Sequence, residues 1–124
     1  MTNPSTVEIA AVAASDRRAN GPDKDALRLN DCQPFQTIVV NTYTSVYELT
    51  VLDGNAGEVI IQGGIGFPEF RRACFIGSTG PDGEFKPNRI EVGLRMRFCA
   101  EDRITITSPV RAYHVAIRDT TPLL

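Results

Sequence analysis

The sequence has few of the residues from which disulfide frameworks and histidine-dependent sites are built. It contains one histidine and three cysteines in 124 residues, and no tryptophan. The cysteines, Cys32, Cys74 and Cys99, are odd in number, widely spaced and without a C-x-x-C pair, unlike the even set of a disulfide-stapled secreted domain. We therefore expect free, mostly buried thiols and a cytoplasmic protein.

Long apolar runs and an excess of positive charge are also missing. No segment approaches the roughly 20 apolar residues of a membrane-spanning helix. The apolar stretch 7–14 is interrupted by Glu8 and has no basic residue before it, unlike a secretory signal. The formal net charge is -2, which gives the whole molecule no electrostatic bias toward nucleic acid or anionic lipid. We expect no membrane association, and nucleic acid is not the favoured partner.

No group of residues has the spacing of a recognisable catalytic, nucleotide or metal site. The segment 63–66, Gly-Gly-Ile-Gly, lacks the Lys-Ser/Thr of a phosphate-binding loop. A nucleophilic mechanism would need His114 beside Cys74 or Cys99, and the sequence does not establish that proximity. We expect no catalytic residue, no cofactor and no bound metal, and an enzyme is the third-ranked interpretation.

The N-terminal quarter differs in composition from the rest of the chain. Residues 15–25 are polar, carry charges of both signs and include Gly21-Pro22. Such a segment buries too little apolar surface to offset its ordering entropy. We interpret residues 1–31 as a flexible arm that a partner can order, and residues 32–124 as the folded domain.

Beyond Pro34, short runs rich in Val, Ile, Thr, Tyr and Phe alternate with Gly, Pro, Asn and Asp. This pattern is typical of strands and turns. It predicts an all-β domain, a small antiparallel sandwich or barrel of six to seven strands. The expected strands are 35–42, 45–52, 57–63, 70–77, 88–99, 102–107 and 110–118.

The clearest strand pattern covers residues 88–99. Its even positions from Ile90 to Phe98 are apolar, whereas Glu91, Arg95 and Arg97 occupy odd ones. This period of two predicts one face in the core and one in water. Glu101-Asp102 then reads as a tight turn into the alternating segment 103–107, and Ser108-Pro109 is expected to break the pairing.

Two surfaces are candidates for binding. The connection 77–88 is longer than a typical hairpin loop, and with the segment 67–70 it supplies aromatic and proline side chains for a contact surface: Phe67, Phe70, Pro81 and Phe85. Exposed aromatics among polar residues are typical of protein interfaces. The alternative is a basic sheet face formed by Arg95, Arg97 and Arg103.

These observations favour a non-catalytic β domain that acts through protein contacts. It would be a subunit of a homo-oligomer or of a larger assembly. The alternative is a small-molecule or nucleic-acid binding module that uses the basic face, as small barrels with basic strands do.

Overall fold

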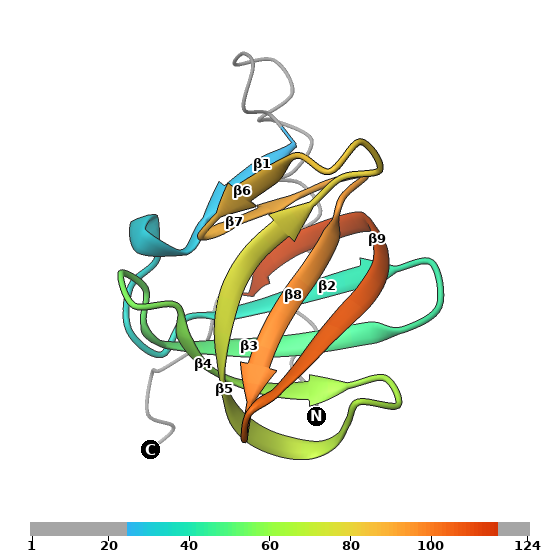
Figure 1. Cartoon of the computed structure of the whole chain (residues 1–124). Coiled ribbons are helices and arrows are strands. Elements are labelled where there is room, and N and C mark those ends of the chain that lie inside the picture. The colour runs from blue at the N-terminus through green and yellow to red at the C-terminus, as the bar shows by residue number, and fades with distance from the viewer. Residues whose placement is uncertain (1–24, 117–124) are drawn as a thin grey trace, which may run out of the picture.

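The computed structural model describes residues 25–116, and nearly all of its regular structure is β (Figure 1). This confirms the all-β class. The only helical element in that range is one 3-10 turn, η2 (Leu29–Asp31). The strands are β1 (Ala26–Arg28), β2 (Thr37–Thr42), β3 (Val46–Asp53), β4 (Glu58–Gly63), β5 (Phe67–Thr79), β6 (Phe85–Pro87), β7 (Arg89–Glu91), β8 (Arg95–Ala100) and β9 (Arg103–Ala116).

The main sheet has seven antiparallel strands in the order β4-β3-β2-β9-β8-β5-β6. β5 also pairs with β4, through residues 67–74, while its residues 74–79 pair with β8. The sheet therefore closes partly into a ring, so the barrel alternative describes it better than two separate sheets. β1 and β7 form a small second sheet beside β6 at one end of the barrel (Figure 1).

The core lies inside this ring and is filled by alternate residues of each strand. β3 directs Leu49 and Val51 inward, as the alternation predicts, and both side chains are fully buried. Phe98 packs against Phe67 and Phe75, with ring centroids 5.7 and 5.3 Å away. Aromatic pairs at these distances add favourable edge contacts to the burial of their apolar surface.

The expected strand 88–99 is two strands. The chain turns at Val92–Leu94 between β7 and β8, and Gly93 has a φ of 95°, a conformation that glycine adopts without steric cost. The alternation nevertheless gives the correct inner face, because Met96 and Phe98 are fully buried. Periodicity thus identifies which residues face the core without showing where a strand ends.

Ser108-Pro109 does not end a strand, contrary to the sequence prediction. β9 runs through it, pairing with β8 up to Pro109 and with β2 from Val110. The proline lies where the strand changes neighbours and where its register with β8 shifts. Because such irregular positions do not need every ladder donor, the missing N–H of proline is tolerated.

The folded domain begins before residue 32, which corrects the expected boundary. β1 pairs with β7, and Leu29 is 0% exposed. The Leu29 N–H also donates to the Asn88 carbonyl at 3.0 Å. Residues 26–31 are therefore part of the fold, while residues 1–24 of the expected arm lie outside the described residues. Within 25–116 no helix is long and apolar enough to cross a membrane.

Candidate contact surface

Phe67 does not belong to an exposed contact surface. It begins β5 with its side chain turned inward and is only 2% exposed. Its ring meets Phe98 edge-on at 5.7 Å. The sequence alone does not separate this position from Phe70, three residues later, which is 56% exposed. Phe67 lies on the same inward-facing side of β5 as the buried Ala73 and Phe75.

The expected long loop 77–88 is mostly a hairpin. Thr79 pairs with Phe85 and Gly77 with Pro87, so only residues 80–84 remain as a loop. Pro81 is exposed in that loop. Phe85 is 43% exposed, but it lies on strand β6. Its position is therefore set by sheet pairing and not by a free loop.

Phe85 and Arg97 bring the two expected surfaces together. The Arg97 guanidinium carbon lies 5.8 Å from the centroid of the Phe85 ring, within the range of a cation–π contact. Gly77 lies between them on β5, because it pairs with both Pro87 and Arg97. A Cβ at Gly77 would approach the Phe85 ring to 2.9 Å. Glycine there leaves room for the ring beside β5.

Two isoleucines that the sequence analysis did not single out extend this surface. Ile106 pairs with Arg97 and Ile104 with Cys99 across the β8–β9 ladder. Directly opposed residues of an antiparallel pair point to the same face. Each isoleucine is 50% exposed, although isoleucine is among the residues that are most often fully buried.

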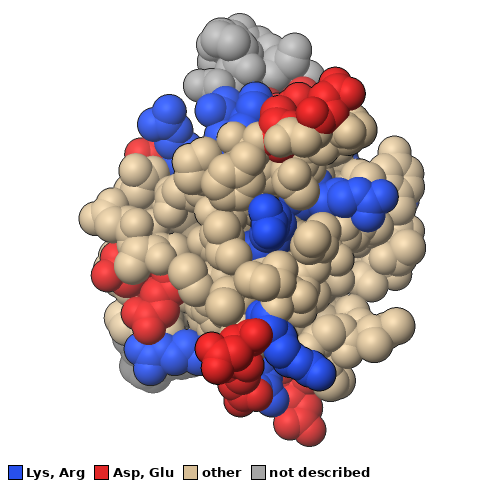
Figure 2. All heavy atoms as spheres, viewed as in Figure 1, with Lys and Arg blue, Asp and Glu red and all other residues tan. Residues whose placement is uncertain are grey.

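We call this surface the outer β8 face, and it comprises six residues: Cys74, Phe85, Arg97, Cys99, Ile104 and Ile106. They come from β5, β6, β8 and β9, on the side of these strands that faces away from the core. Figure 2 shows a largely uncharged surface over β5 and β8, interrupted by a few basic groups, with the acidic groups toward its borders.

Phe70 lies further along β5 from this face. Ala73 and Phe75 are buried, so the intervening alternate positions Phe70, Arg72 and Cys74 point outward. Arg72 forms an ion pair with Glu58 of β4 at 2.6 Å. This ion pair therefore separates Phe70 from the outer β8 face. Pro81 lies in the β5–β6 loop, outside that face.

The three arginines of the expected basic face are dispersed. Arg95 pairs with Pro109 and donates to the Thr107 carbonyl at 3.3 Å. Arg103 pairs with Ala100 at the opposite end of β8. Arg97 lies against Phe85 between them. The structure thus places Arg97 in an apolar surface and does not gather the three charges.

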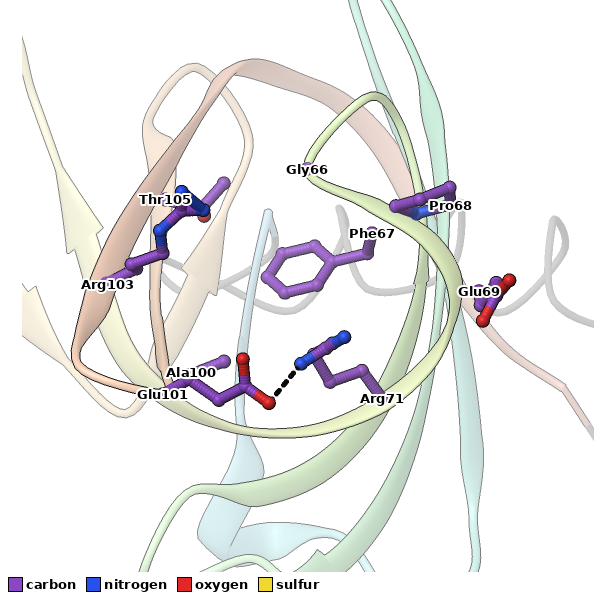
Figure 3. Close-up of a pocket in the computed structure, with 9 residues that line it drawn as sticks. All are labelled: Gly66, Phe67, Pro68, Glu69, Arg71, Ala100, Glu101, Arg103 and Thr105. Carbon is purple, nitrogen blue, oxygen red and sulfur yellow. Dashed lines mark ion pairs between the residues drawn. The ribbon is translucent and has the colours of Figure 1, made fainter.

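Arg103 instead lines a pocket at the end of the barrel (Figure 3). The ring of Phe67 lies at its centre, and Arg71 forms an ion pair with Glu101 at 2.5 Å beside it. Glu69 also lines the pocket. Charges of both signs therefore balance one another there, which gives an anion no net attraction. Among residues 25–116 no cluster of three or more metal-ligating side chains occurs.

His114 is not beside a cysteine in the strand pairing. It lies on the second half of β9, opposite Val39 of β2, whereas Cys74 and Cys99 face each other on β5 and β8. Burial lowers the pKa of His114, since desolvation disfavours the charged imidazole. The arrangement does not support a Cys–His nucleophile.

No protein-family model, curated protein or solved structure matches this chain.

Proposed function

We propose that this domain is a non-catalytic, cytoplasmic module that acts through protein contacts, as a subunit of a homo-oligomer or of a larger assembly. The observation that carries the proposal is the exposure of Phe85, Ile104 and Ile106 around Arg97 on one sheet face. Three free cysteines support the cytoplasmic assignment.

The composition of the outer β8 face matches that of the centre of an interface. At the centres of protein interfaces, aromatic residues and arginine are enriched, while lysine and acidic residues are depleted. Arg97 covers an aromatic ring and is itself half-buried, so part of its desolvation has already occurred in the isolated domain. A partner that covers Phe85 and the two isoleucines would remove more apolar surface from water, which is favourable.

The face is also preorganised for binding. Its residues lie on paired strands, and Phe85 is held between the β5–β6 hairpin and the Arg97 guanidinium. Association therefore immobilises few additional side chains, which reduces its entropic cost. A central aromatic in such a site commonly contributes about 2 kcal/mol or more on truncation.

Self-association is tested by light scattering on the full chain over a concentration series. We expect a mass above that of the monomer, and a return to monomer for Ile106→Lys, which replaces an exposed apolar side chain of the face by a charged one. Ile65→Lys is the matched control, because Ile65 is 96% exposed in the β4–β5 connection, away from this face.

Hetero-assembly is tested by comparing the proteins that co-purify with the wild type and with each variant. A monomeric wild type whose co-purifying proteins are unchanged by Ile106→Lys would contradict the proposal. Salt-sensitive binding to oligonucleotides that Arg95→Ala weakens would favour the alternative, a basic nucleic-acid binding face.

A further inference from the structure

Cys74 and Cys99 are directly opposed on neighbouring antiparallel strands. They are register partners in the β5–β8 ladder. Opposed residues in such ladders have Cα atoms about 4.5 or 5.5 Å apart, according to the hydrogen-bonding pattern. A disulfide needs a Cα separation of about 4.4–6.8 Å. Both ladder spacings fall within that range, and both side chains point to the outer face.

Both thiols are free, and the pair is open to solvent on one side. Cys74 is exposed and Cys99 is half-buried. Burial raises the pKa of Cys74, and the neighbouring Cys99 and Glu58 raise it further. Cys32, after η2, has no such partner in the β5–β8 ladder.

We infer that Cys74 and Cys99 form a reversible redox pair, which low-molecular-weight disulfides such as oxidised glutathione convert to an intramolecular disulfide. This goes beyond the proposed contact function, and of that proposal it rests only on the cytoplasmic location. Intracellular disulfides are commonly transient and redox-sensing, and this pair has the exposure that such a role requires.

The reaction is two successive thiol–disulfide exchanges. The more exposed thiol, Cys74, loses its proton, and its thiolate attacks one sulfur of the small disulfide, so that one small thiolate leaves. The Cys99 thiolate then attacks the Cys74 sulfur and displaces the second small thiolate. The two protein thiols lose two protons and two electrons in total. The small disulfide accepts both electrons and, with the protons, becomes two thiols.

Oxidation would change the surface on which the pair lies. Cys99 pairs with Ile104 and lies two residues from Arg97 on β8. A disulfide would join β5 to β8 at the edge of the exposed apolar residues and remove both thiol protons. Oxidation of the pair would therefore alter the chemistry of the outer β8 face.

The test treats the full-length protein with oxidised glutathione at about pH 9, because the thiolate is the attacking species and the pKa of Cys74 is raised. Remaining thiols are then alkylated, and intact mass and peptide mapping are measured. We expect one alkylated cysteine, Cys32, a Cys74–Cys99 cross-linked peptide, and recovery of all three thiols with dithiothreitol. Three alkylated cysteines, a cross-link to Cys32 or a link between chains would overturn the inference.

Single variants distinguish the pair from three independent thiols. Cys99→Ser should accumulate a stable glutathione adduct on Cys74, because the resolving thiol is gone. Cys32→Ser should form the disulfide as fast as the wild type. An equal yield of persistent Cys74 adduct in the wild type and in Cys99→Ser would show that Cys99 does not resolve it, and would refute the pair.

Discussion

The Thr107 hydroxyl oxygen accepts the backbone N–H of Met96 at 3.0 Å and donates to the Ser108 carbonyl at 2.7 Å. Met96 lies where the β8–β9 register shifts, between the pairs Arg95–Pro109 and Arg97–Ile106. The threonine side chain therefore replaces a ladder acceptor that the shifted strand does not supply. Its side chain is buried, so no water can take its place.

Replacement of Thr107 by valine should destabilise the domain by about 1–3 kcal/mol, because the buried Met96 N–H loses its acceptor. Thr105→Val is the control. It lies on the same face of β9, and its hydroxyl makes no hydrogen bond within residues 25–116. Urea denaturation measures both free energies of unfolding. Equal losses for the two variants would mean that the hydrogen bond contributes nothing specific.

Two large apolar residues on facing strands should respond very differently to truncation. Phe98→Ala removes a fully buried ring that contacts Phe67 and Phe75, and it should cost about 3–5 kcal/mol. Ile106→Ala removes a half-exposed side chain and should cost under about 1 kcal/mol. Chemical melts of the two variants settle the order, and a larger loss for Ile106 would contradict the outward orientation.

Asn88 connects three segments at the end of the barrel. Its side-chain amide donates to the Gly54 carbonyl at 2.8 Å, and its side-chain oxygen accepts the Asn30 N–H at 2.8 Å. Its φ of 58° is one that asparagine tolerates better than most residues. Asn88→Ala should lower the free energy of unfolding by about 1–3 kcal/mol, because it removes both side-chain hydrogen bonds and places alanine at a positive φ.

Asn88→Gly separates these two causes, since glycine keeps the backbone conformation and removes only the side-chain hydrogen bonds. Its free energy of unfolding should lie between those of the wild type and Asn88→Ala. A glycine variant as stable as the wild type would show that the hydrogen bonds to Gly54 and Asn30 are dispensable.

The stability of the domain should fall as the pH drops below 6.5, in part because of His114. Burial lowers the pKa of His114 from its ordinary 6.5, so below that pH the unfolded chain binds a proton more readily than the folded one. The contribution is fully present above 6.5 and is lost as the pH falls toward the folded pKa. The free energy of unfolding, measured by urea denaturation across this pH range, should change less with pH for His114→Gln than for the wild type.

Alternation gave the inner face of residues 90–98, because strand geometry fixes which side successive residues occupy whether or not the strand is continuous. It could not reveal the turn at Gly93, because the even positions are apolar both before and after that turn. The strand break depends on Val110, whose backbone exchanges hydrogen bonds with Gly93 and Leu94. That contact is distant in sequence.

The outward position of the β9 isoleucines follows from information already in the sequence. Glu101 and Asp102 form the expected two-residue turn, each with positive φ, so Ala100 pairs with Arg103 and Phe98 with Thr105. If Phe98 is inside, Thr105 must share its side and Ile104 must point out. Turn length thus determines orientation here more strongly than hydrophobicity does.

The Cys74–Cys99 pair and the contact between Phe85 and Arg97 could not be found in this way. β5 and β8 are separated in the sequence by β6, Asn88, β7 and the turn at Gly93, and their register is set by the closed sheet. No local pattern encodes such a register. The burial of Phe67 escapes sequence analysis for the same reason, because it depends on Phe98 across the barrel.

β9 divides its length between two neighbours, β8 and β2, and this has a kinetic consequence. β2 lies early in the sequence and β9 is the last described strand. The sheet therefore cannot close until both ends of the domain have met. During synthesis, β2 and β8 both wait for residues 103–116 to leave the ribosome. Because such long-range pairing makes folding slow, the nascent chain exposes unpaired strand edges for longer than a helical protein of this size, and chaperones have a longer opportunity to bind it.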